Sequence, residues 1–414
     1  MKILWIVNTI LPYPSKKLGL KPTVFGGWLN SLLNGIKKSD DVEKIGIVTV
    51  YKGKTMQIFK EKEITYYLIP SNNINKYNIK LEQYCLEIES EFKPDIVHIH
   101  GTEYPHGLAF LNACPHIKSC VSIQGLVSIY GIKDIYNASI DFLDMVKTIT
   151  PRDIIKRDFL FNQYKKFLKK GIYEKQVLRK CNLIIGRTTW DYANSYQISG
   201  EKKYEHCNEN LRDAFYNKKW EINNIDRHTI FISQASYPIK GFHKVLEALI
   251  ILKKIYPDIK VKVAGQKLLD NKLKLNGYAK YLKKIISKNG LENNIVFLGL
   301  LNEKEVCDNL LKSNLFLQAS SIENSPNSLG EAMLLGVPCV ASNVGGTADM
   351  LTDKKEGFLY PFNDISLMAN YIIEIFENDK LAYEIGKNAQ THAKKTHDIE
   401  HNVNKMIEIY KKIK

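Results

Sequence analysis

Cysteines are few in this sequence, and none is arranged for cross-linking or for metal binding. Seven cysteines are spread over 414 residues, with no C-x-x-C pair and an odd total. Disulfide-stabilised secreted domains and zinc sites of the common types need closely spaced cysteines. We therefore expect a reduced, cytoplasmic protein with no disulfide framework and no zinc site.

Long hydrophobic runs are also missing. No stretch approaches the roughly eighteen apolar residues that indicate a membrane-spanning helix. The apolar start of the chain, residues 1–8, has a core of five apolar residues and no small-residue cleavage site, so we interpret it as a buried strand and not as a signal peptide. The apolar and charged fractions, 44% and 25%, are typical of a globular protein.

Acidic residues are outnumbered by basic ones. Lys and Arg total 59 against 44 Asp and Glu, which gives a net charge of +15. This excess indicates an acidic partner, and nucleic acid, anionic lipid and nucleotide diphosphates all qualify. Because the sequence lacks the aromatic and basic motifs of the common RNA-binding modules, we expect no nucleic-acid partner.

The basic excess is concentrated between Arg152 and Lys180, where ten basic residues stand against three acidic ones. On a helix, the apolar side chains that share one face are Leu160, Tyr164, Phe167, Leu168 and Ile172. The lysines on the other face are Lys165, Lys166, Lys169 and Lys170. Two interpretations stay open: a peripheral helix on the anionic inner face of the cell membrane, and a core helix with a solvated outer face.

A chain of this length predicts two domains. Short apolar strands alternate with helices in both halves, which predicts an α/β protein with parallel sheets covered on both faces. In the first half we expect strands at Lys2–Val7, Lys44–Val50, Ile64–Ile69, Asp95–Ile99, Ser119–Ile123 and Asn182–Ile185, and helices at Phe25–Lys38 and Tyr77–Glu91. In the second half we expect strands at His228–Ile232, Lys260–Ala264, Asn294–Leu298 and Leu315–Gln318.

The segment from Glu323 to Gly346 carries the strongest signal of a ligand site. Glu323 and Glu331 flank seven residues, and Ser325 followed by Pro326 predicts a helix that begins there, with Ser325 as its N-cap. The first N–H groups of a helix lack partners within it and favour an anion such as phosphate. The N–H groups expected at this start belong to Asn327, Ser328 and Leu329. An ordinary solvated cap is the alternative interpretation of the helix start alone.

Two glycine-bearing turns follow this helix start. Gly336 predicts the end of the helix, a buried strand comes next, and Gly345 and Gly346 open a second turn. Since both turns lie at ends of neighbouring strands of the predicted sheet, they favour a diphosphate site over a purely structural loop.

Together these motifs resemble the donor site of retaining glycosyltransferase family 4. The matching motifs are Glu323-x7-Glu331, Gly336-Val337-Pro338, Gly345-Gly346 and Gly357-Phe358-Leu359. That family has the GT-B fold, in which two Rossmann-like domains face each other across a cleft and the last helix crosses back to the first domain. The resemblance therefore implies an acceptor domain over residues 1–216, a donor domain over 228–394 and a crossing helix over 395–414.

The resemblance also implies roles for individual residues. Lys240 would neutralise the donor phosphates, Glu323 would contact hydroxyls of the donor sugar, and Glu331 would contact the nucleotide ribose, so that Lys240 and Glu323 are the expected catalytic residues. The arginine usual before this lysine is replaced by Gln234, which makes Arg212 a candidate for contact with the diphosphate, with a surface salt bridge as the alternative. The other expected donor contacts are Gly26 and Gly27 from the first domain and Gly299 and Leu300 around the base.

Polar side chains follow two strands of the first half. His100, Glu103 and His106 come after one strand, and Gln124 comes after the next. Because both strand ends open toward the same edge of the sheet, we expect these four residues to contact the acceptor, with purely structural histidines as the alternative. No carboxylate completes a metal site with the histidines, so we expect no metal there. Many family members have a histidine in place of Gln124. The change to glutamine counts against proton transfer at this position, so the resemblance implies only a hydrogen-bonding contact with sugar.

The sequence also lacks the Asp-x-Asp motif with which many sugar transferases hold a metal ion. Fixed-charge stabilisation of the leaving diphosphate by Lys240 and the helix start is the other solution, so we expect a metal-independent enzyme without a cofactor. The resemblance implies retaining transfer of a sugar from a nucleotide diphosphate sugar, with UDP as the expected nucleotide. The implied acceptor is a surface polysaccharide, as in capsule or lipopolysaccharide, or a lipid-linked glycan.

Other functions are less consistent with these motifs. Eight residues of intact helix would separate Glu323 from Glu331 by roughly 12 Å at ~1.5 Å per residue. The two carboxylates of a retaining glycosidase lie about 5–5.5 Å apart, which counts against a hydrolase. A nucleotide-sugar 2-epimerase of the same fold and a catalytically inactive sugar-binding relative stay open.

Overall fold

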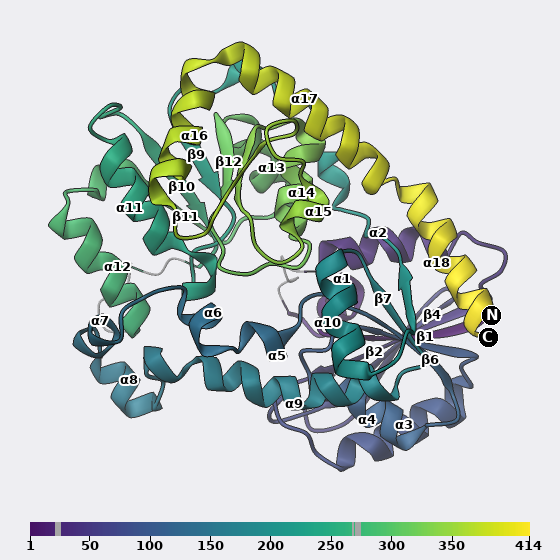
Figure 1. Ribbon diagram of the computed structural model, residues 1–414. Helices are drawn as coiled ribbons and strands as arrows, with labels where there is room; N and C mark the ends of the chain where they lie inside the picture. Colours follow the sequence, from purple (N-terminus) through teal and green to yellow (C-terminus); the bar gives the residue numbers. More distant parts are fainter. Residues whose placement is uncertain (21–25, 267–268, 270–274) are drawn as a thin grey trace. The chain divides into compact units, whose positions relative to one another are not determined.

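The computed structural model describes residues 1–20, 26–266, 269 and 275–414. The chain divides into two compact units, each assembled from separated stretches of sequence (Figure 1). Unit 1 consists of Met1–Ile129, Phe167–Asn210 and His397–Lys414, and unit 2 consists of Tyr130–Lys166 and Leu211–Thr396. Among the described residues, no helix is both long and apolar enough to cross a membrane.

The sheet of unit 1 has eight strands in the order β3-β4-β2-β1-β5-β6-β7-β8. All neighbours pair in parallel except β3, which runs antiparallel to β4. The strands are β1 (Lys2–Val7), β2 (Lys44–Tyr51), β3 (Gln57–Glu61), β4 (Ile64–Pro70), β5 (Ile96–His100), β6 (Lys118–Ser122), β7 (Leu183–Gly186) and β8 (Tyr204–His206). The sequence predicts six of them to within one residue. It does not predict β3, which has no buried residue, or β8, which is only three residues long.

Helices cover both faces of this sheet. They are α1 (Pro12–Lys17), α2 (Gly27–Ile36), α3 (Lys80–Phe92), α4 (Pro105–Ala113), α5 (Val127–Tyr130), α9 (Tyr164–Lys180), α10 (Thr189–Ser199) and α18 (Ile399–Ile413). One apolar cluster lies under α3 and α4, and a second lies under α2 and α18. Helices α2 and α18 pack closely, because a Cβ atom on Gly35 of α2 would lie 2.3 Å from Cγ2 of Val403 in α18. The helix start expected at Phe25 lies outside the described residues.

The sheet of unit 2 has six parallel strands in the order β11-β10-β9-β12-β13-β14. They are β9 (Thr229–Ile232), β10 (Lys260–Ala264), β11 (Ile295–Gly299), β12 (Leu315–Gln318), β13 (Cys339–Ser342) and β14 (Phe358–Tyr360). The helices are α11 (Phe242–Leu252), α12 (Gly277–Lys288), α13 (Glu303–Leu311), α14 (Asn327–Leu335), α15 (Thr347–Met350), α16 (Ile365–Glu377) and α17 (Asp379–Thr396), with 3-10 turns η2 (Asp213–Phe215), η3 (Ile222–Asn224), η4 (Pro238–Lys240) and η6 (Glu292–Asn294). The strand order reverses direction between β9 and β12, so their carboxyl ends form a switch point, the usual ligand position in such sheets.

Residues 130–166 belong to unit 2, although the first domain expected from the sequence includes them. They form α6 (Lys133–Asn137), α7 (Phe142–Lys147), α8 (Pro151–Lys156) and η1 (Leu160–Asn162). The Ser321 hydroxyl donates to the carbonyl of Ile135 at 2.7 Å, and His243 Nε2 lies 2.8 Å from the carbonyl oxygen of Ala138. These contacts use backbone carbonyl groups, which leave no trace in the residue pattern, so the sequence did not predict that residues 130–166 group with unit 2.

The amphipathic segment is oriented differently from the expected core helix. In α9 the buried residues are Gly171, Glu174, Val177 and Leu178, whereas Leu168 and Ile172 are exposed. Gly171 lies against α5, where its Cβ would be 2.7 Å from Cα of Ser128, and the Glu174 carboxylate accepts the backbone N–H of Ser128 at 2.9 Å. A buried carboxylate that accepts N–H groups therefore fixes the rotation of the helix, and two apolar side chains face outward as a result.

Candidate active site

Three loops of unit 2 meet at the switch point of its sheet. They follow β9, β12 and β13, and backbone hydrogen bonds join them. The N–H of Ser321 donates to the carbonyl of Ile239 at 2.8 Å, and the N–H of Gly346 donates to the carbonyl of Glu323 at 3.0 Å. The loops that carry Lys240 and Glu323 are thereby fixed relative to each other.

Two close approaches between these loops require glycine. Gly241 has φ 64°, and a Cβ atom there would lie 1.7 Å from the carbonyl oxygen of Ala319. Gly345 has φ 54°, and its Cβ would lie 1.9 Å from the carbonyl oxygen of Glu323. Both positions combine a left-handed backbone with a close approach that no side chain permits. The turn expected at Gly345 thus serves to bring the third loop against Glu323.

Lys240 and Glu323 form an ion pair at this point. Lys240 Nζ lies 2.5 Å from Oε1 of Glu323, and the Ser320 hydroxyl donates to the same oxygen at 2.6 Å. Both side chains are largely buried. Burial by itself would lower the pKa of Lys240, but the carboxylate of Glu323 outweighs it and raises the pKa above its ordinary value, so the ammonium stays charged. The two expected catalytic residues are in direct contact.

The helix start differs by one residue from the expected one. α14 begins at Asn327 with Pro326 as its N-cap, and Ser325 lies outside it, because the backbone of Pro326 is extended, with φ −70° and ψ 114°. Leu329 is not a ligand contact: its N–H donates to the carbonyl of Pro326 at 2.9 Å and its side chain is fully buried. Of the three residues that the sequence predicted at this helix start, Asn327 and Ser328 stay candidates for contact with the nucleotide-sugar donor.

Arg212 forms an ion pair with Glu331. Its Nε and one terminal nitrogen each lie 2.6 Å from an oxygen of Glu331, which is a bidentate arrangement, and its guanidinium carbon lies 4.9 Å from the ring centre of Phe215. Burial raises the pKa of Glu331, and the guanidinium opposes that shift. Two residues that the sequence assigned to different parts of the donor are therefore joined, and each carboxylate of the motif has a cation beside it.

The expected base-binding residues lie on the same edge of the sheet. Gly299 ends β11 with φ 82°, and its carbonyl accepts the N–H of Gly265, at the end of β10, at 2.9 Å. Leu300 follows with 55% of its side chain exposed. An exposed apolar side chain beside two glycine backbones offers a flat surface on which an aromatic base can pack.

Unit 1 has its own switch point, between β1 and β5. Glu103 follows β5, and its Oε2 accepts a hydrogen bond from Nδ2 of Asn8, which follows β1, at 2.7 Å. Burial raises the pKa of Glu103 to about 7, although Lys170 and the hydrogen bond from Asn8 oppose the shift. Gly26 is the N-cap of α2, with φ 80°, and Gly27 is the first residue of that helix.

Two of the expected acceptor residues, His100 and His106, are buried. His100 is buried with its ring centre 4.5 Å from that of Trp5, and burial holds the pKa of His100 well below its ordinary value. His106 is buried as well, and its Nε2 lies 3.0 Å from the carbonyl oxygen of Val7. His106 belongs to α4, and His100, the last residue of β5, lines a small pocket that Arg187 and Glu209 also line. In the described part of the chain, no group of three or more His, Cys, Asp or Glu side chains could hold a metal ion.

Gln124 belongs to a polar network that the sequence did not reveal. Its Nε2 donates to Oε1 of Glu209, and the second oxygen of Glu209 lies 2.5 Å from a guanidinium nitrogen of Arg187. Arg187 also donates to the carbonyl of Ile123 at 3.0 Å. Arg187 directly follows β7 and Glu209 lies just after β8, so a polar residue at a strand end was the available signal for both.

Residues 213–392 match the family model described as glycosyl transferases group 1. This part of the chain is similar to that family. The group 1 domain contains Lys240, Glu323 and Glu331, and Arg212 immediately precedes it. The similarity to known glycosyltransferases thus falls on the unit that holds both ion pairs, as the resemblance in the sequence indicated.

Characterised relatives of the group 1 domain are named glycosyltransferases. The UDP-Gal:alpha-D-GlcNAc-diphosphoundecaprenol alpha-1,3-galactosyltransferase of Escherichia coli is 28% identical over 162 residues, which cover 39% of this chain and 39% of the relative. The poly(ribitol-phosphate) alpha-N-acetylglucosaminyltransferase of Staphylococcus aureus is 28% identical over 147 residues, 34% of this chain and 29% of the relative. The matches thus span less than half the length of these two enzymes.

Solved structures match over almost the whole chain. Sucrose-phosphate synthase from Thermosynechococcus elongatus matches with a TM-score of 0.73 at 13% identity, covering 100% of this chain and 98% of that one. Anabaena HepE, solved in complex with UDP and glucose, matches with a TM-score of 0.69 at 17% identity, covering 99% of each chain. At these identities the similarity shows the fold, and it confirms the GT-B fold expected from the sequence.

Proposed function

We propose that this protein is a retaining glycosyltransferase that transfers a sugar from a UDP-linked donor to a surface-polysaccharide or lipid-linked glycan, without a metal ion. The observation that carries the proposal is the Lys240–Glu323 pair beside the start of α14, at the switch point of the group 1 domain. The relatives support the substrates, since one is named for UDP-Gal and a diphosphoundecaprenol acceptor and another for poly(ribitol-phosphate).

The proposed mechanism uses charges that the fold already holds in place. Lys240 and the N–H groups at Asn327 and Ser328 stabilise the negative charge that develops on the leaving diphosphate. Glu323, which Lys240 and Ser320 orient, accepts hydrogen bonds from hydroxyls of the donor sugar.

The second ion pair serves the nucleotide in this proposal. Glu331 accepts a ribose hydroxyl, because a carboxylate has about four acceptor positions and Arg212 occupies only two of them. Arg212 keeps further N–H groups that can point to a phosphate, and it supplies the positive charge that Gln234 lacks.

Isothermal titration with UDP, GDP and ADP, with and without EDTA, tests the donor site. We expect UDP to bind, EDTA to have no effect, and Lys240→Gln to weaken binding about 10- to 100-fold, which is the size of a charge-assisted hydrogen bond. Lys254→Gln, an exposed lysine of the same unit, is the matched control and should bind UDP normally. Binding of UDP that Lys240→Gln leaves unchanged would contradict the assignment of this lysine.

Product analysis then separates the proposed reaction from the two alternatives. An epimerase converts the UDP-sugar in the absence of acceptor, and an inactive relative binds UDP without turnover. The proposed enzyme releases UDP only when a glycan acceptor is present and forms a product with the anomeric configuration of the donor. Release of free epimerised UDP-sugar would refute the transferase proposal.

We further propose that unit 2 contacts an anionic membrane through α8. Ile154 and Ile155 are 61% and 83% exposed, and Lys156 and Arg157 follow them directly, also exposed. Exposed apolar side chains beside cations favour binding at the surface of an anionic bilayer.

Vesicle sedimentation tests this contact. We expect the protein to sediment with phosphatidylglycerol vesicles and not with phosphatidylcholine vesicles, and the double variant Ile154→Ser/Ile155→Ser to lose most of that binding. Equal sedimentation of the variant would exclude α8 as the contact.

A further inference from the structure

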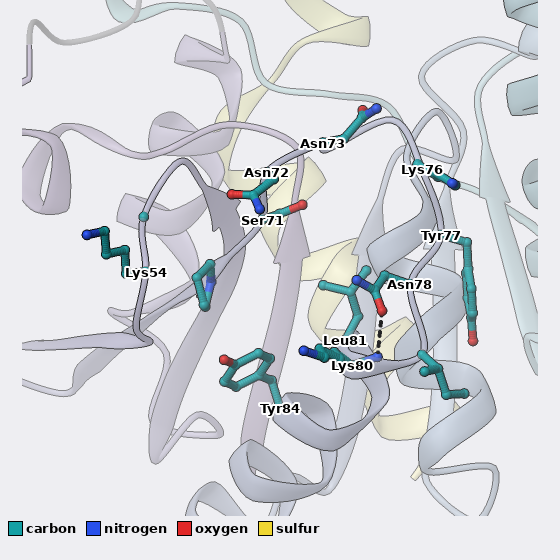
Figure 2. Close-up of a pocket in the computed structure, with 13 residues that line it drawn as sticks. Lys54, Ser71, Asn72, Asn73, Lys76, Tyr77, Asn78, Lys80, Leu81 and Tyr84 are labelled. Atoms are coloured by element: carbon teal, nitrogen blue, oxygen red, sulfur yellow. Dashed lines mark hydrogen bonds between the residues drawn. The ribbon is translucent and has the colours of Figure 1, made fainter.

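A cavity in unit 1 is used by none of the residues discussed so far. Its volume is about 740 Å³, which is within the range of small-molecule binding pockets. It lies where β2 and β4 end and α3 begins (Figure 2). The lining residues are Gly53, Lys54, Pro70, Ser71, Asn72, Asn73, Lys76, Tyr77, Asn78, Ile79, Lys80, Leu81 and Tyr84.

The lining is positively charged. It contains Lys54, Lys76 and Lys80 but no aspartate or glutamate. Figure 2 shows Lys54 and Lys76 on opposite sides of the cavity, with Lys80 between them. None of these three lysines forms an ion pair with another residue that the structure describes, and all three are exposed. Unpaired ammonium groups around one cavity attract an anion.

The amide side chains of the lining present donors. The side-chain oxygen of Asn73 accepts the N–H of Asn75 at 3.0 Å, and that of Asn78 accepts the N–H of Lys80 at 3.0 Å. Within the described chain, the NH₂ groups of Asn73 and Asn78 have no acceptor. Since the oxygens are occupied and the NH₂ groups are not, these amides add hydrogen-bond donors to the three cations, and the cavity favours a ligand rich in acceptor oxygens.

Two tyrosines give the cavity apolar surfaces. Tyr84 lies beside Lys80 in Figure 2, and Tyr77 stands at the far side. The hydroxyl of Tyr77 donates to Glu82 and accepts a hydrogen bond from Asn112 at 2.7 Å, so its ring is held in one orientation. Glu82, which follows Leu81 in the sequence, accepts the hydrogen bond from Tyr77 and does not line the cavity. Aromatic rings of this kind pack against the apolar faces of ligands that also carry polar groups.

We propose that this cavity binds a negatively charged stretch of carbohydrate, one that bears carboxylate or phosphate groups. The proposal rests on the proposed function in one respect, which is that the carbohydrate belongs to the acceptor glycan. The positions are compatible, because β4, β2 and β1 follow one another in the sheet, pair in parallel and so end at the same edge. Two strand spacings of about 4.8 Å place the end of β4 roughly 10 Å from that of β1, within reach of a glycan chain.

Direct binding measurements test the cavity without any transfer reaction. The probes are tetragalacturonate, which carries four carboxylates, and maltotetraose, which is neutral, titrated into the full-length protein at low salt. We expect tetragalacturonate to bind at least tenfold more tightly than maltotetraose, and added salt to weaken it. The triple variant Lys54→Gln/Lys76→Gln/Lys80→Gln should lose at least tenfold in affinity for tetragalacturonate.

A second triple variant controls for net charge. Lys38→Gln/Lys44→Gln/Lys118→Gln removes three exposed lysines of the same unit outside the cavity and should bind tetragalacturonate like the natural protein. Equal weakening by both triple variants would overturn the proposal, because the effect would then be one of overall charge. Inorganic phosphate that binds as tightly as the tetrasaccharide would also overturn it, as would lysine-dependent binding to anionic vesicles in place of the sugar.

The cavity and the donor site fail in distinguishable ways. UDP binds to unit 2 in the proposed function, so the Lys54/Lys76/Lys80 variant should retain full affinity for UDP. If UDP binding is absent while lysine-dependent binding of tetragalacturonate is present, the donor assignment is refuted and the cavity proposal stands. If UDP binds and tetragalacturonate does not, the cavity proposal is refuted and the donor assignment stands.

Discussion

At the scale of single residues, Glu103 is the carboxyl whose charge state changes near neutral pH. Burial raises its pKa from 4.5 to about 7, so the folded protein holds this proton more tightly than the unfolded chain does. Stability from such a group is present at low pH and is lost as the pH rises from about 4.5 to 7. We expect Glu103→Gln to remove this part of the loss, measured as the free energy of unfolding in urea at pH 5 and pH 8. Glu63→Gln, an exposed carboxyl of the same unit, should leave the difference unchanged.

The site residues show what the sequence can indicate at this scale. The resemblance pointed to Lys240, Glu323 and Glu331, and the structure brings Lys240 and Glu323 into contact at the switch point of unit 2. The sequence could not show that each carboxylate has a cation beside it, since Arg212 and Glu331 are far apart in the sequence. It left open whether His100 contacts the acceptor or is structural, because the alternation of a strand does not distinguish outer and inner faces when helices cover both, and His100 is buried.

At the scale of elements, one buried hydroxyl of α18 adds polar contacts to the apolar packing of this helix against the sheet of unit 1. The hydroxyl of Tyr410 accepts a hydrogen bond from Nε1 of Trp5 at 3.1 Å and lies 2.7 Å from Nδ1 of His98. Tyr410→Phe would leave both ring nitrogens buried without a partner, which costs about 1–3 kcal/mol for a group of this kind. Urea unfolding should show this loss, whereas Tyr196→Phe, an exposed tyrosine of the same unit, should change little. An unchanged unfolding free energy for Tyr410→Phe would mean that water replaces the hydroxyl.

Elements with continuous apolar runs were predictable, and elements defined by distant partners were not. The bounds of β1, β10 and β12 agree with the sequence prediction. β1 and β12 are short apolar runs, whereas β10 alternates lysine with buried valine, and both patterns are visible in the sequence. β3 depends on pairing with β4 and has no buried residue of its own. α9 was predicted as a helix, but its rotation depends on Glu174 and Gly171 against α5, which periodicity alone does not contain.

At the scale of the whole molecule, the chain path makes a separate prediction for each unit. Unit 1 needs residues 397–414, since Val403, Met406, Ile407 and Tyr410 complete one of its two apolar clusters. The apolar cluster of unit 2 contains none of these residues, and the two ion pairs lie entirely within unit 2. A chain that ends at Thr396 should therefore lose the stability of unit 1 and keep nucleotide binding in unit 2.

Thermal unfolding with and without UDP measures both halves of this prediction. The shortened chain should show a transition at lower temperature for unit 1, and UDP should raise only the transition of unit 2, because a ligand stabilises the unit that binds it. A chain shortened only by Lys414 is the control, since it loses a single exposed ion pair with Asp95 and should unfold like the natural protein. Loss of UDP binding by the chain that ends at Thr396 would contradict the prediction that unit 2 binds the nucleotide without an intact unit 1.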